Sequence, residues 1–181
     1  MVAYMGDLVA KVSAAAAAYN IILKTLETKR PANIGFHGLF EVVKSRAQSH
    51  AETLLSFNGR WMKPEGLEDE EDDEEEEQKR EIEKVRGELG EDPTVLRAVE
   101  AALAMDLRLH MAVLKKREQV EAAADWEGKE NLDNFEACLM KEIKAWNGLR
   151  TRIIYAGPGA AAAELDMKIE IHLDSRPRRW S

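Results

Sequence analysis

Residues 36–61 read FHGLFEVVKSRAQSHAETLLSFNGRW, and this stretch decides the fold class. Its apolar side chains recur at alternating steps of three and four residues, a spacing that places them on one face of an α-helix. The stripe consists of Phe36, Phe40, Val43, Ala47, His50, Leu54, Phe57 and Trp61. Asn33 is suited to cap the helix before Ile34, so the sequence predicts one long helix that ends near Trp61.

Three other segments have the same helical spacing. The first covers about residues 5–26 and includes a run of five alanines, which favours helix. Another begins at Asp92, an N-cap followed by proline at the first helical position, and extends to about Ala124. The last extends from about Glu130 to the glycine-proline stop at Gly157. We therefore expect an all-α protein in which two antiparallel helix pairs form a four-helix bundle over residues 1–157.

The acidic residues are concentrated between the second and third predicted helices. Residues 65–92 hold 16 of the 34 carboxylates and four of the 26 basic side chains, so this segment carries a charge of −12 and the rest of the chain +4. A connection this long is unusual inside a compact domain. One known explanation is a crossover that carries the chain back along the length of a helix bundle. We expect residues 62–92 to form this acidic crossover, solvated over 65–77, while 78–89 could form a charged single-layer helix with a weak apolar edge; a cation-collecting patch or a partner contact is the alternative.

The C-terminal segment, residues 158–181, has a different pattern. Residues 165–173 read LDMKIEIHL and alternate strictly between apolar and polar side chains, which is the period of a β-strand. A lone strand must pair with another chain to satisfy its backbone, whereas a short fifth helix nucleated by the alanines at 160–163 is the alternative. The sequence thus predicts an interaction tail, with residues 164–181 as the contact for a protein partner.

Composition excludes several classes of protein. Cys138 is the single cysteine, which rules out a disulfide within the chain and leaves an inert core or interface thiol. Basic residues are not interleaved with aromatic residues on one face, so nucleic-acid binding is not expected. No export signal is evident, which predicts an intracellular, cytoplasmic protein. No membrane span is expected, because the longest apolar stretches are interrupted by Asp7, Lys11, Asn20 and Lys24.

Three runs together resemble the ferritin family. They are His50-Ala51-Glu52, the run AVEAALAMD at 98–106 and the run DNFE at 133–136. The likeness covers about residues 5–156. It implies a ferritin-like four-helix bundle with one long crossover that assembles into hollow shells storing ferric iron, as a homo-oligomer or in co-assembly with other ferritin-like subunits.

The resemblance also indicates where the ligands of a di-iron ferroxidase centre would lie. The matching positions hold Val12, Ala47, His50, Asp106 and Ile143, the last with Glu142 as its neighbour. Two irons need several anionic ligands, which one Asp and one His cannot supply. The chain is therefore similar to the family's non-catalytic, light-chain-like subunits, with a structural or co-assembly role in an iron-storage shell and no required cofactor. The alternative is a ferritin-like scaffold subunit of a larger complex with no iron role.

The polar residues on the predicted helical stripes need a physical explanation. His50, Asp106, His110 and Glu142 all occupy core-facing positions, where an unpaired charge is costly. They could form a neutralised hydrogen-bond network, they could hold a single iron or zinc ion, or some could lie at a wet rim. By the same resemblance, Asp133 and Glu136 match the acidic pair that lines cation channels in ferritin shells, although a helix N-terminus favours carboxylates in any case.

Overall fold

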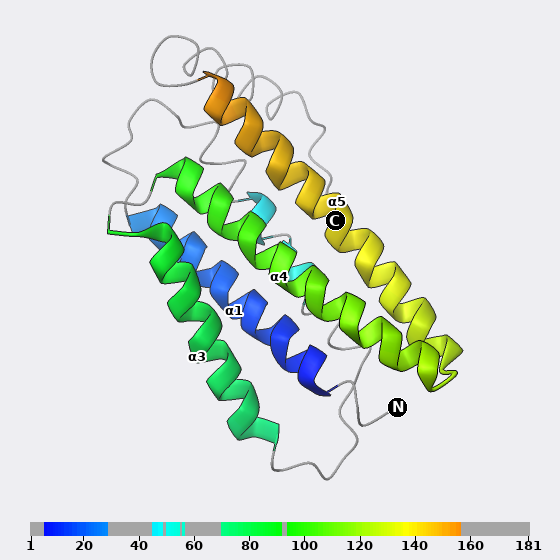
Figure 1. The fold of residues 1–181 in the computed structure, drawn as a ribbon. Helices are drawn as coiled ribbons and strands as arrows, with labels where there is room; N and C mark the ends of the chain where they lie inside the picture. Colours follow the sequence, from blue (N-terminus) through cyan, green and yellow to red (C-terminus); the bar gives the residue numbers. More distant parts are fainter. Residues whose placement is uncertain are drawn as a thin grey trace, which may run out of the picture.

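The computed structural model describes residues 6–28, 45–48, 50–54, 56, 70–91 and 94–156. All regular secondary structure in these residues is helical, which confirms the all-α class. The long helices are α1 (Gly6–Thr28), α3 (Glu70–Leu89), α4 (Val95–Ala122) and α5 (Trp126–Ala156). Helical residues 45–48, 50–54 and 56 form a further helical segment, cyan in Figure 1, which we call the central segment.

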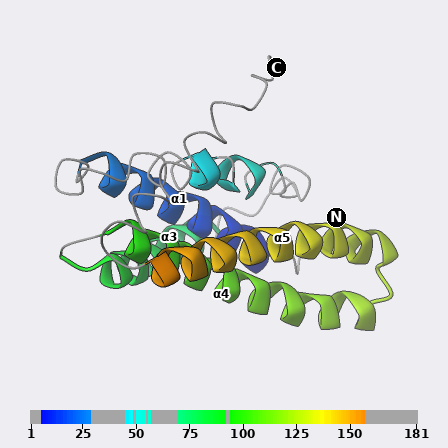
Figure 2. The ribbon, with the colours of Figure 1, turned by 90° about the horizontal axis from the view of Figure 1, so that it is seen from above.

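The long helices lie along a common direction (Figure 1). α4 and α5 form the antiparallel pair that the sequence predicts, because ion pairs join opposite ends of the two helices. Arg150 Nε lies 3.1 Å from Glu100 Oε1, and Arg117 binds Asp133 at 2.9 Å. Figure 2 shows the central segment beside α1.

Two helices begin at different residues from those predicted. α4 is capped by Thr94, whose Oγ1 accepts a hydrogen bond of 3.1 Å from the backbone N–H of Arg97. The prediction that Asp92 caps this helix is therefore wrong. α5 begins at Trp126, not near Glu130, because Asp125 Oδ1 accepts a hydrogen bond of 2.9 Å from the backbone N–H of Gly128. Both caps are local side-chain bonds that satisfy otherwise unpaired N–H groups.

The acidic segment is helical from Glu70 to Leu89, and its later part packs against the other helices, whereas Glu75 and Glu76 remain exposed, in line with the solvated stretch expected there. Val85 is fully buried on α3, and Arg108 of α4 binds Glu81 and Glu88, the latter at 2.6 Å. These ion pairs neutralise carboxylates that face the other helices, which allows so acidic a helix to pack. The helix ends at Gly90, which adopts a φ of 71°, a conformation that glycine tolerates.

The pairing of charged residues shows how α3 runs relative to its neighbours. Lys11, near the start of α1, binds Glu77, near the start of α3, at 3.1 Å. The two helices are therefore parallel. α4 is antiparallel to α1, because Lys116 in its last turns lies 2.6 Å from Asp7 in the first turn of α1. α3 thus carries the chain along the length of α1 and α4 (Figure 1).

One hydrophobic core joins α1, the central segment, α3, α4 and α5. Its largest fully buried side chains are Trp146, Tyr19, Phe135, Leu8, Ile22, Leu54, Met105, Leu132, Leu139, Val12 and Val85. α1 contributes its stripe with a spacing of three to four residues, as the periodicity predicts. Each helical element packs one stripe of side chains into this core, and many alanines of α1 and α4 are buried because they lie on those stripes.

Residues Gly6–Thr25 of α1 are long and apolar enough, by length and composition, to span a membrane, with a mean hydropathy of 1.2. They form the one such segment in the described part of the chain, and half of it is buried within the molecule. The core helix of a folded domain can have the same length and composition. The expectation of no membrane span is therefore confirmed only in outline. The described residues contain one weakly apolar helix and no clear membrane span.

The predicted tail, residues 158–181, lies outside the described residues. Its assignment as a strand or as a fifth helix remains a prediction.

Candidate functional site

A cluster of polar and aromatic side chains occupies the centre of the core. It contains Tyr19 from α1, His50 from the central segment, Asp106 from α4 and Trp146 from α5. His50 is 2% exposed and the other three are fully buried. Each element supplies one residue from its buried stripe, so the cluster depends on all four helical elements being in register. We call these four residues the central cluster.

Two direct hydrogen bonds hold the central cluster together. Nε2 of His50 lies 2.9 Å from Oδ1 of Asp106, and Nε1–H of Trp146 donates to the Tyr19 hydroxyl at 3.2 Å. The rings of Tyr19 and His50 meet edge to face with centroids 5.0 Å apart, and Tyr19 stacks on Trp146 at 6.4 Å. Such aromatic contacts add packing energy beyond the area they bury. The cluster is therefore a compact, buried polar network.

Burial controls the ionisation of the network. Removal from water raises the pKa of Asp106 above its ordinary value, although the neighbouring His50 acts in the opposite direction. Burial also raises the pKa of Tyr19 well above its ordinary value, and the nearby Asp106 adds to that effect. Nδ1 of His50 and Oδ2 of Asp106 have no hydrogen-bond partner in the described part of the structure.

Glu142 lies at the edge of the central cluster and does not bind His50 or Asp106 directly. Its carboxylate accepts from Arg46 of the central segment at 3.3 Å, and the same guanidinium lies 5.9 Å from the ring centroid of Trp146. This position allows a cation–π contact between Arg46 and the indole.

Burial raises the pKa of the half-buried Cys138 thiol, which is consistent with the predicted inert thiol.

His110 belongs to a second, separate network between α4 and α5. Its Nε2 lies 3.2 Å from Oε1 of Glu136, whose other oxygen is bound by Arg117 at 2.8 Å. Arg117 also binds Asp133 at 2.9 Å, and Lys129 lies 3.7 Å from the same carboxylate. Asp133 and Glu136, predicted from the resemblance to line a cation channel, are thus engaged by basic groups of their own chain.

The donor atoms near the central cluster do not fit a pair of irons. Val12 and Ala47 are fully buried in the hydrophobic core, and Ile143 is buried as well. Among the residues that the structure describes, no group of three His, Cys, Asp or Glu side chains is placed to hold a metal ion. His50 and Asp106 remain as one imidazole and one carboxylate, fewer than the three or four ligands of an iron or zinc site. The residual metal site stays a prediction, and the geometry favours the alternative of a hydrogen-bond network.

Tyr19 and Trp146 lie within the first and last predicted helices, where no polar partner was expected for either of them. The partners come from helices far apart in the chain, which a periodic pattern does not pair. Arg46 lies one helical turn before His50, on the same face. Arg117 lies four residues before Glu121, with which it pairs at 3.7 Å, but its contacts with Asp133 and Glu136 are to another helix.

No protein-family model matches this chain, and no curated protein shows significant sequence similarity to it.

Tyr19→Phe tests the described network through its pH dependence. Trp146 loses its acceptor, so we expect the variant to be less stable near neutral pH by about 0.5–1.5 kcal/mol. Because the pKa of Tyr19 is raised in the folded state, its contribution is complete below the ordinary value of 10.0 and is lost as pH rises toward the folded value. Urea unfolding should therefore show a steeper alkaline loss in the wild type than in Tyr19→Phe. Tyr155→Phe, at a side chain 92% exposed, is the control and should change neither quantity.

Proposed function

We propose that this chain is a ferritin-like four-helix bundle without catalytic metal chemistry, serving as a structural or co-assembling subunit of an iron-storage shell. The observation that carries the proposal is the 2.9 Å contact between His50 and Asp106 in a dry core. These two are the only ligand-type residues at the positions that resemble the ferroxidase centre. Each is bound to the other, and aliphatic side chains fill the matching positions at Val12, Ala47 and Ile143.

The arrangement of the helices supports the ferritin-like topology. α1, the central segment, α4 and α5 each contribute one residue to the central cluster, as expected for four helices around one core. α3 is parallel to α1 and antiparallel to α4, so it is suited to carry a crossover from one end of the bundle to the other. In this proposal the crossover is itself a helix that covers the side of the bundle between α1 and α4.

One observation favours the alternative, a scaffold subunit of a larger complex with no iron role. A cation channel needs carboxylates that are available to incoming ions. Arg117 binds both Asp133 and Glu136, and Lys129 lies near Asp133. An arginine already neutralising the pair weakens the attraction for a passing cation. Under this alternative, the protein contributes contact surface alone.

Mass under native conditions distinguishes the two roles. The full chain is measured by light scattering alone and after co-refolding with a ferroxidase-active ferritin subunit. The shell role predicts either a closed homo-oligomer or incorporation into mixed shells. A monomer that stays out of the mixed shells contradicts the shell role and leaves the scaffold role.

A further inference from the structure

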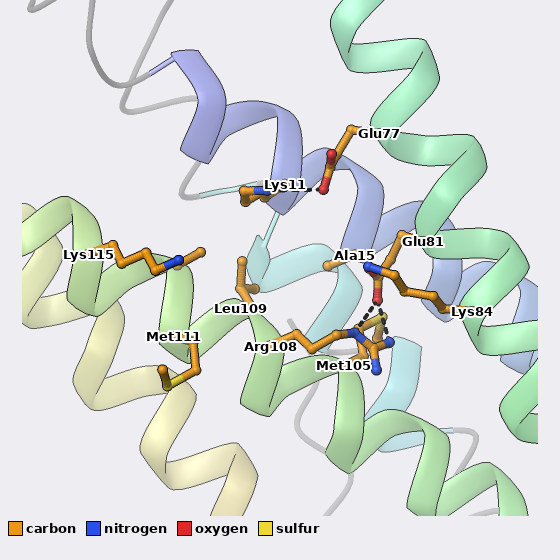
Figure 3. Close-up of a pocket in the computed structure, with 11 residues that line it drawn as sticks. Lys11, Ala15, Glu77, Glu81, Lys84, Met105, Arg108, Leu109, Met111 and Lys115 are labelled. Atoms are coloured by element: carbon orange, nitrogen blue, oxygen red, sulfur yellow. Dashed lines mark hydrogen bonds and ion pairs between the residues drawn. The ribbon is translucent and has the colours of Figure 1, made fainter.

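A groove between α1, α3 and α4 lies outside the central cluster and takes no part in the proposed function. It encloses about 220 Å³ (Figure 3). Its apolar lining comes mainly from Ala15, Met105, Leu109, Met111 and Ala112. Leu109 is nearly buried, whereas Met111 is 58% exposed, so the apolar surface extends from the interior to the rim.

The charged residues of the groove are unbalanced in favour of cations. Four basic side chains and two carboxylates line it. Lys11 binds Glu77 at 3.1 Å, Lys84 lies 3.8 Å from Glu81, and Arg108 binds both Glu81 and Glu88, of which Glu88 lies outside the lining. Among the described residues, Lys115 is the lining cation that no carboxylate neutralises. Figure 3 shows it on α4, with Leu109 between it and Lys11.

We propose that this groove binds a small amphipathic organic anion, such as a short aliphatic carboxylate. Its hydrocarbon part would lie on Leu109 and Met111, and its anionic group would lie at the rim near Lys115. Lysine stems are apolar while their ammonium groups reach water, so one side chain serves both parts of such a ligand. The groove is smaller than the 300–1,000 Å³ typical of drug-sized ligands. The ligand must therefore be short.

Titration of the full chain with hexanoate, followed by amide chemical shifts, tests the proposal. We expect saturable shifts at Lys11, Ala112 and Lys115. Hexylamine has the same hydrocarbon part and the opposite charge, and inorganic phosphate has the charge without the hydrocarbon part. Both should leave these amides essentially unshifted at the concentration where hexanoate saturates. Equal binding of hexylamine or of phosphate would overturn the amphipathic anion as the ligand.

Charge reversal supplies the second test. Lys115→Glu removes one attraction and adds one repulsion, and should weaken hexanoate binding about fivefold, on the scale of exposed ion pairs. Lys144→Glu makes the same change at an exposed site on α5, outside the groove, and should leave binding unchanged. Met111→Ser should also weaken binding while the fold is kept, because Met111 is mostly exposed. Identical affinities for Lys115→Glu and Lys144→Glu would rule the site out. None of these results depends on the proposed role in a shell.

Discussion

Replacing Trp146 by alanine will lower the free energy of unfolding by about 3–5 kcal/mol, the range for removing a large aromatic side chain from a core. Trp146 is fully buried and stacks on Tyr19. The substitution also removes the donor that binds the Tyr19 hydroxyl and the ring that Arg46 approaches. Urea unfolding followed by circular dichroism measures the change.

Trp126→Ala is the matched control. Trp126 opens α5 and is 70% exposed, so the same substitution there should change stability by no more than about 0.5 kcal/mol. If the two variants unfold at the same urea concentration, α5 does not pack through Trp146 as described.

Asp106→Ala should destabilise the protein by about 1–3 kcal/mol, because it leaves the buried His50 Nε2 without a partner. Glu118→Ala, at an exposed position on the same helix, should have little effect. Asp106→Asn keeps a side chain of the same shape that can still hydrogen-bond His50, and should cost less than alanine.

A double-mutant cycle isolates the pair itself. His50→Leu combined with Asp106→Leu removes both polar groups, so the double variant should be more stable than the sum of the single losses predicts. Strict additivity of the two substitutions would show that His50 and Asp106 do not interact in the folded protein.

Helical periodicity was sufficient to place the buried stripes of α1, α4 and α5, although His110 and Glu142, predicted to face the core, are only partly buried. His50 and Asp106 were both expected in the core, because helix geometry relates residue spacing to a face without knowledge of the partner helix. His110 lies one turn beyond Asp106, about 6 Å farther along α4. That rise places it beside Glu136 of α5, in a different network. Such pairings depend on how helices are aligned, which no single periodic pattern specifies.

The packing of the acidic helix, which was expected only over 78–89, could not be predicted for a related reason. Carboxylates dominate the sequence of α3, and a weak apolar edge alone does not indicate packing. Its docking depends on Arg108, which lies in another helix and binds Glu81 and Glu88. The predicted helix starts at Asp92 and near Glu130 were wrong because local side-chain hydrogen bonds at Thr94 and Asp125, which the helical period does not specify, set where α4 and α5 begin.

The central claim is that the core of this bundle holds a hydrogen-bond network in place of a di-iron centre. Oxygen consumption after addition of ferrous iron to the purified, metal-free full chain tests it most directly. We expect consumption at the rate of the buffer alone, because buried aliphatic side chains occupy the positions that would need carboxylates. A fast phase that saturates at about two irons per chain, the stoichiometry of a di-iron bundle, would contradict the claim.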